Sequence, residues 1–279
     1  MAQDFAGKLT QLSHSVPVRL VATPAESFAC ALSAWTAPEV LEASHGLGDE
    51  FDVLPIRNCP TDPIAAYWQL ERDGANCVVA AAHRNIGVAD LVDGRAPIPA
   101  LIRLFVRDHR RFFFVLDEGD VAGLIDWSDL NRPAACTSLF PVVQQVEHAI
   151  QTVLASQLNA DSWLKYVKPE RRRKIEKVAE SRRQANIHTD LLSVALFSDL
   201  TTICIDCAEI QSMLRRNKDD ISAEAELLNR FRERVCHGTE SLVDDAFGVD
   251  RLNTALAAAK RCVACLTLGI TAKNCVPNS

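Results

Sequence analysis

The sequence has no apolar run of the roughly 18–20 residues that are needed to cross a bilayer. Its first residues do not pair a basic segment with an apolar one, as a signal peptide does. No low-complexity tract is long enough to suggest disorder, and the apolar share of 48% is typical of a globular protein. We therefore expect a folded, soluble, cytoplasmic protein without a membrane partner.

Glycine-rich phosphate loops and nucleophile elbows are also absent from the sequence. The 279 residues include ten cysteines, and without an export signal we expect free thiols rather than a disulfide framework. Two Cys-x-x-Cys pairs, Cys204/Cys207 and Cys262/Cys265, could bind zinc through four thiolates. Both pairs lie in apolar segments with helical spacing, which suits core packing equally well. We predict no metal site and no cofactor.

The formal net charge of −6 argues against a protein that coats nucleic acid with its whole surface, but it leaves room for a local basic site. The length favours two domains. We predict an α+β chain in three parts. These are an N-terminal segment (1–60) packed on the next region, an α/β module (61–135), and an all-α helical bundle (136–279).

In the front half of the chain, short apolar runs alternate with segments whose apolar residues have helical spacing, and turn residues separate them. The expected strands are Val18–Val21, Cys77–Ala82, Phe112–Leu116 and Val121–Ile125, of which the last two form a hairpin through the turn Asp117–Asp120. The expected helices are Ala25–Trp35, Asp62–Leu70 and Pro97–Arg107.

The stretch from about Ile86 to Pro133 resembles a CBS domain, a small α/β module that often occurs as a pair of copies which bind adenosine nucleotides. The segment Thr61–Ala82 resembles part of a degenerate first copy. In nucleotide-binding members a Ser or Thr contacts phosphate, and an Asp three residues later holds the ribose. Asp129 has the ribose position here, but Asp126 has the phosphate position, where a carboxylate repels phosphate. The resemblance thus implies either nucleotide binding at Asp126 and Asp129 or a packing or dimerisation module.

From Leu139 onward the apolar period changes to 3.6 residues, which predicts helices. One apolar stripe contains Phe140, Val143, Val146, Ile150 and Val153. Three further helices are expected at Leu191–Ala208, Ser222–Cys236 and Asp250–Leu268, so that a bundle of four or five helices buries the stripes.

One of these helices ends with Arg232 and His237, separated by four residues and followed by Gly238. This pattern resembles that of HEPN ribonucleases, and the resemblance covers about Ser138 to Val276. It implies that Arg232 and His237 are catalytic and that Glu233 and Arg234 orient them or the substrate. It also implies a homodimer with a shared cleft, and a role in stress response or phage defence.

The residue types suit RNA cleavage, because RNA carries its own nucleophile in the 2′-hydroxyl. A histidine can transfer the proton, and a guanidinium can hold the phosphate without a metal. Residues five apart on a helix point roughly 140° away from each other, so either the long Arg232 side chain swings round or two subunits combine. The alternatives are a HEPN-like fold that does not cut RNA, and a His237 that only caps the helix.

The basic stretch Lys165–Arg183 could follow an RNA backbone through Arg171, Arg172, Arg173 and Lys174, or it could be a solvated charged face. Glu147-His148 and His188 could approach the Arg232 motif, although packing or surface roles are the simpler expectation. The sequence thus predicts a metal-independent endoribonuclease of HEPN type behind a CBS-like regulatory or dimerisation module. The rival hypothesis is a non-catalytic protein that senses an adenosine nucleotide.

Overall fold

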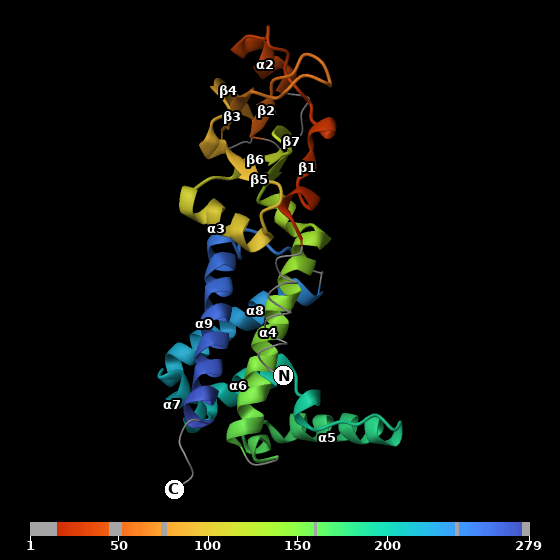
Figure 1. Cartoon of the computed structure of the whole chain (residues 1–279), viewed down its shortest axis with the longest axis vertical. Coiled ribbons are helices and arrows are strands. Elements are labelled where there is room, and N and C mark those ends of the chain that lie inside the picture. Colours follow the sequence, from red (N-terminus) through yellow and green to blue (C-terminus); the bar gives the residue numbers. More distant parts are fainter. Residues whose placement is uncertain (1–15, 45–51, 74–76, 159–160, 238–239, 275–279) are drawn as a thin grey trace. The chain divides into compact units, whose positions relative to one another are not determined.

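The computed structural model describes residues 16–44, 52–73, 77–158, 161–237 and 240–274 (Figure 1). The chain divides into two compact units, one of Ser15–Ala135 and the other containing Cys136–Ser279. We call them the α/β unit and the helical unit. No helix among the described residues is long and apolar enough to span a membrane.

The first sheet of the α/β unit has the strand order β1-β7-β6-β5. Strand β5 (Leu91–Asp93) runs parallel to β6 (Phe112–Asp117), with helix α3 (Ile98–Asp108) as the crossover between them. Strand β7 (Asp120–Asp126) returns antiparallel to β6, and the short β1 (Thr23–Pro24) pairs with β7 at the edge. The helix and the hairpin that the sequence predicted in this stretch are therefore confirmed.

A second sheet has the order β2-β3-β4 and is antiparallel throughout. Its strands are β2 (Val53–Pro55), β3 (Ala66–Arg72) and β4 (Val78–Asn85), and helix α2 (Ala37–Ser44) contacts β4. The predicted helix at Asp62–Leu70 is wrong, because β3 occupies its second half. Tyr67 and Trp68 are buried in two different hydrophobic clusters, and this packing of the strand outweighs the helix-start signal of an Asp-Pro pair.

The two sheets share a hydrophobic cluster, which holds the α/β unit together. Val53 and Tyr67 of the second sheet pack against Phe114 and Leu124 of the first. The rings of Tyr67 and Phe114 lie 5.1 Å apart between centroids. Burial of these large side chains is the main stabilising contribution that links the sheets.

The start of the α/β unit is less regular than predicted. Val18–Leu20 is a short 3₁₀ helix (η1) rather than a strand, although the backbone N–H of Val18 donates to Ala96. The predicted helix at Ala25–Trp35 is also wrong beyond a single 3₁₀ turn, η2 (Ala25–Ser27). Its next residues are extended, because the backbone of Ala31 pairs with that of Pro55 and Arg57.

The helical unit consists mainly of α-helices. They are α4 (Pro133–Gln157), α5 (Pro169–Gln184), α6 (Phe197–Asp206), α7 (Ala208–Leu214), α8 (Lys218–His237) and α9 (Val249–Asn274), with the 3₁₀ turns η5 (Ser162–Tyr166) and η6 (Leu192–Val194). The pairs α6–α8, α8–α9 and α7–α9 are in contact.

The long helix predicted at Leu191–Ala208 is divided into three pieces. The carboxylate of Asp199 accepts the backbone N–H of Leu196 and thereby fixes the start of α6 at Phe197. Cys207 is extended, which ends α6 before α7 begins. In the first predicted stripe Val143, Val146, Ile150 and Val153 are buried as expected, whereas Phe140 is 43% exposed.

Candidate functional site

Arg232 and His237 lie in the last two turns of α8, beside its buried face. That face contains Leu228, Phe231 and Val235, which anchor the helix in the core. Arg232 is half-buried and His237 is exposed. The Nη1 atom of Arg232 lies 2.7 Å from Nε2 of His237, so the two predicted catalytic residues are in contact at a surface that a substrate can reach.

The contact assigns a donor and an acceptor. A guanidinium has donors only, so Arg232 donates and Nε2 of His237 accepts. The contact thus uses the acceptor role of Nε2, the role that a base plays towards a substrate proton. His237 is therefore arranged as a base.

The roughly 140° between positions five apart on a helix is bridged within one chain by the length of the arginine side chain. The contact itself therefore needs no second subunit, and the homodimer stays a prediction. Gly238, which the sequence placed after the motif, lies outside the described residues.

A carboxyl group from α4 lies near this pair. Burial raises the pKa of Glu147, and the Arg232 guanidinium acts in the opposite direction. Burial also raises the pKa of the Cys236 thiol, which Arg232 lowers and Glu147 raises. A carboxyl, a guanidinium and an imidazole thus share one patch, and the sequence had named Glu147-His148 as able to approach the motif. His148 itself lines a separate cavity with Trp163, and His188 is exposed.

The two supporting residues of the sequence prediction point elsewhere. Glu233 is exposed, whereas Arg234 is buried and lies against the Phe247 ring, 4.9 Å from its centroid. Arg234 donates to the backbone oxygen of Ser241 and, at 2.7 Å, to the carboxylate of Asp244. Its guanidinium fastens the segment between α8 and α9, and it does not face the Arg232–His237 contact.

In the α/β unit, Asp126 and Asp129 surround the turn after β7. The carboxylate of Asp126 accepts the backbone N–H groups of Ser128 and Asp129 and so caps η4 (Ser128–Asn131). Asp129 is buried, accepts the N–H of Asp126 at 2.9 Å and pairs with Arg132 at 2.7 Å. Burial raises the pKa of Asp129 to about 6. Both carboxylates thus serve the fold of the turn.

Two cavities adjoin this turn. The first has a volume of about 410 Å³ and is lined by Thr23, Trp127, Asp129 and Arg132 among others. The second, of about 860 Å³, lies beside it, because Asp52, Arg111 and Phe112 line both. The second cavity collects basic side chains that the sequence analysis did not select, together with the carboxylates of Asp52, Asp73 and Asp90. The basic residues are Arg72, Arg84, His109, Arg110 and Arg111.

Most of these arginines already have a carboxylate. Arg110 pairs with Asp90, while Arg111 and Arg72 both pair with Asp52, at 3.3 and 3.6 Å. Arg84 is exposed on β4 and takes part in no ion pair among the described residues. The second cavity therefore keeps Arg84 available for an anion, and the first cavity beside it contains the indole ring of Trp127.

Comparisons with known proteins give limited information. No family model matches the chain, and no curated protein matches it. One similar solved structure is the CBS domain of the bacterial CNNM/CorC family Mg²⁺ transporter in complex with ATP. The sequence identity is 15% and the TM-score is 0.34, and the match covers 47% of this chain and 94% of that chain. Another is the same domain with the inhibitor IGN95a, with 17% identity, 46% and 82% covered, and a TM-score of 0.33. The HEPN resemblance of the bundle stays a prediction.

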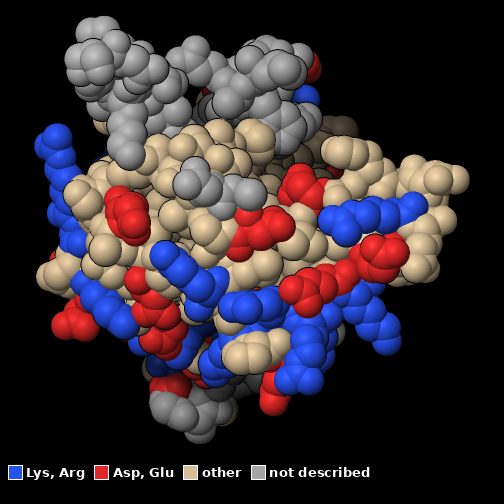
Figure 2. Space-filling view, turned by 90° about the horizontal axis from the view of Figure 1, so that it is seen from below, with Lys and Arg blue, Asp and Glu red and all other residues tan. Residues whose placement is uncertain are grey.

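The basic helix α5 uses part of its charge internally. Arg171 binds both oxygens of Asp199, at 3.1 and 2.9 Å, and Arg172 donates to the backbone oxygen of Leu164 at 2.7 Å. Arg173 and Lys174 are exposed. Figure 2 shows that basic and acidic side chains intermingle on the face drawn there. Of the four residues predicted to contact RNA, two thus hold the protein together.

The Cys-x-x-Cys pairs differ from each other. Cys204 lies on α6 and Cys207 beyond its end, so this first pair does not share one helix as predicted, whereas Cys262 and Cys265 both lie on α9. No group of three or more side chains able to hold a metal ion occurs in the part of the chain that the structure describes.

Proposed function

We propose that the helical unit cleaves RNA, with His237 as the base and Arg232 as the phosphate-binding group. The observation that supports this proposal is the contact of 2.7 Å between Arg232 Nη1 and Nε2 of the solvent-accessible His237. A phosphate that binds to Arg232 accepts the hydrogen bonds of the guanidinium group. Nε2 of His237 is then free to accept a proton from the substrate.

The reaction is an internal transesterification. The 2′-hydroxyl gives its proton to Nε2 of His237, and its oxygen forms a bond to the adjacent phosphorus. The bond from phosphorus to the 5′ oxygen breaks, and this oxygen leaves with a proton from water. The products are a 2′,3′-cyclic phosphate and a 5′-hydroxyl, while Arg232 offsets the negative charge that develops on the phosphate. The nucleophile comes from the substrate, so the step itself does not call for a metal.

The test is incubation of the purified chain with mixed RNA in EDTA, followed by analysis of the new ends. We expect 2′,3′-cyclic phosphates, and no cutting of the same sequence made with 2′-O-methyl groups. Arg232→Ala should reduce the rate about 10²–10³-fold, and His237→Ala about 10²–10⁴-fold.

Arg230→Ala is the matched control, because Arg230 lies on the same helix, is exposed and, within the described part of the chain, forms an ion pair only with Glu226 four residues away. It should keep the wild-type rate. RNA that stays intact at every protein concentration refutes the proposal, and so does equal cutting by wild type and both site variants. Sedimentation of the wild type measures whether the expected homodimer forms.

A second function concerns the α/β unit, which we propose to bind a phosphate-bearing ligand such as an adenosine nucleotide. The adjoining cavities support this proposal, since one has an indole ring for a base and the other has Arg84 for a phosphate. The phosphates would lie in the arginine-lined cavity rather than beside Asp126. A regulatory protein of this kind is also the rival to a nuclease.

Calorimetry with ATP, AMP and adenosine tests this second function. We expect ATP to bind most tightly, and Arg84→Gln to weaken ATP binding roughly tenfold through the loss of a charged contact. Arg103→Gln, at an exposed position of α3 outside both cavities, should bind like the wild type. Equal affinity for ATP and adenosine, or no binding of either, contradicts the idea.

A further inference from the structure

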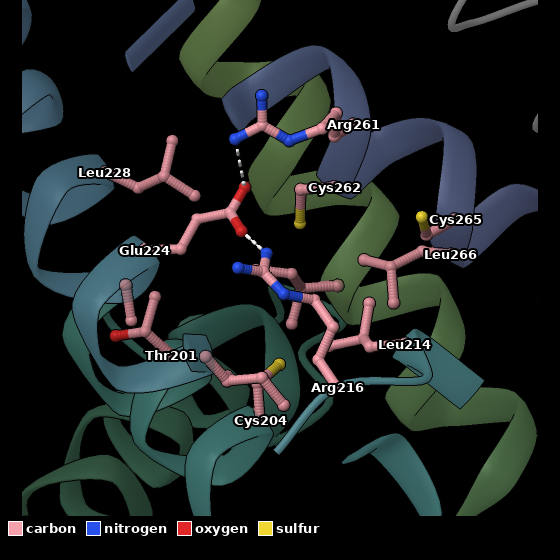
Figure 3. A pocket seen from close by; sticks show the side chains of 13 residues that line it. Thr201, Cys204, Leu214, Arg216, Glu224, Leu228, Arg261, Cys262, Cys265 and Leu266 are labelled. Carbon is pink, nitrogen blue, oxygen red and sulfur yellow. Dashed lines mark hydrogen bonds and ion pairs between the residues drawn. The ribbon is translucent and has the colours of Figure 1, made fainter. Parts of the chain in front are cut away.

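A third cavity lies inside the helical unit, among residues of five helices. Its volume is about 180 Å³. Figure 3 shows side chains of α6, α8 and α9 directed into it. The apolar part of the lining consists of Ile150, Leu214, Ile221, Ala225, Leu228 and Leu266. The cavity opens to solvent on the side of Arg261 and Cys265, and its apolar part is suited to a small apolar group.

Three thiols complete the wall, namely Cys204, Cys262 and Cys265. Burial raises the pKa of Cys204 strongly and that of Cys262 to about 12. These two thiols therefore stay protonated at neutral pH and behave as small apolar groups. The interior of the cavity is accordingly neutral.

The charges of the cavity belong to one carboxylate and two guanidinium groups. Glu224 pairs with Arg216 and, at 3.5 Å, with Arg261 (Figure 3). The side chain of Glu224 is only 11% exposed, while those of Arg216 and Arg261 are 36% and 58% exposed. The two guanidinium groups and the single carboxylate together carry a net charge of one positive unit. Arg261 is the more distant and the more exposed of the two arginines.

We propose that this cavity binds a monocarboxylate with an apolar chain of about six to eight carbons, a size suggested by the small hydrocarbons that cavities of about 150 Å³ accept. The chain lies among the apolar residues and thiols, and the carboxylate pairs with Arg261 beside Glu224. A neutral ligand leaves the extra positive charge unpaired, and a long acyl chain exceeds the space. The inference does not depend on RNA cleavage, because none of the lining residues belongs to the Arg232 patch.

The experiment compares octanoate with 1-octanol, which has the same chain and no charge, by calorimetry and thermal shift on the full chain. We expect octanoate to bind about tenfold more tightly than 1-octanol, because its carboxylate adds one charge-assisted contact. Arg261→Gln should remove this preference and leave octanol binding unchanged. Arg251→Gln, an exposed arginine on the same helix that donates to the backbone of Ala246, should keep it.

Filling the cavity tests its location. Ala225→Leu adds three carbons to the lining and should abolish the response to octanoate, and Cys265→Leu serves the same purpose if the first variant does not fold. The proposal is overturned if octanoate produces no heat and no thermal shift, if octanol binds as tightly as octanoate, or if a folded cavity-filling variant binds like the wild type.

Discussion

Replacing Asp129 by asparagine should remove a pH dependence from the α/β unit. The Asp129 carboxyl is buried beneath the turn after β7, where it accepts the N–H of Asp126 and pairs with Arg132. Burial raises its pKa to about 6, and this effect outweighs the opposing influence of the Asp126 N–H and of Arg132. The nearby Asp126 carboxylate also raises it. Asparagine keeps the shape and an acceptor oxygen but cannot titrate.

The magnitude follows from the two pKa values of the Asp129 carboxyl. A folded value of about 6 against an unfolded value of 3.8 means that the folded state binds the proton more tightly. A difference of roughly two pH units corresponds to about 3 kcal/mol of unfolding free energy. Because the folded value is the higher one, this stabilisation is fully present below pH 3.8 and is lost as the pH rises through about 6.

The assay is urea unfolding of wild type and Asp129→Asn between pH 4.5 and 7.5, followed by fluorescence. Other carboxyl groups titrate in both proteins, so the difference between the two free energies isolates Asp129. We expect this difference to shift in favour of the variant as the pH rises across the window. A difference that stays constant with pH, or that moves in favour of the wild type, would refute the reasoning about burial.

Three further changes test contacts that position the candidate sites. Gly123→Ala places a Cβ 2.6 Å from the backbone oxygen of Thr23 and should destabilise the α/β unit by about 1–3 kcal/mol in urea unfolding, whereas Gly87→Ala meets only ordinary contacts and should not. Arg234→Met removes the link to the segment before α9 and should lower the thermal midpoint and speed hydrogen exchange there. Arg171→Met should speed hydrogen exchange in α5, since the Arg171 guanidinium binds the Asp199 carboxylate that caps α6.

Sequence reasoning succeeded where one local pattern fixes the structure. The hairpin after Phe112 follows from an apolar run, an acidic turn and a second apolar run, and Glu118 and Gly119 adopt the positive φ that such a turn requires. Helix α8 follows from the 3.6-residue spacing of its apolar side chains. In these segments the local preference and the tertiary packing agree.

Sequence reasoning failed where contacts with distant segments of the chain determine the local structure. Strand β3 exists because β2 and β4 pair with it on both sides, which no pattern within Asp62–Leu70 reveals. The inward direction of Arg171 depends on Asp199, which lies 28 positions later in the chain. The arginine-lined cavity escaped notice for the same reason, since its cations come from separate strands and turns.

Arginine is common to both candidate sites, and the fold decides which arginines remain for a ligand. Arg232 and Arg234 are two positions apart on α8, yet one reaches a surface histidine and the other is bound by Ser241 and Asp244. The net charge is −6, and basic and acidic side chains alternate on the face in Figure 2, so we expect no broad cationic surface for RNA on that face. Each phosphate contact with a single strand adds about −0.7 to the slope of log K against log salt, so cleavage of RNA should coexist with weakly salt-dependent binding. Recognition then depends on the geometry around His237 rather than on the field of the whole molecule.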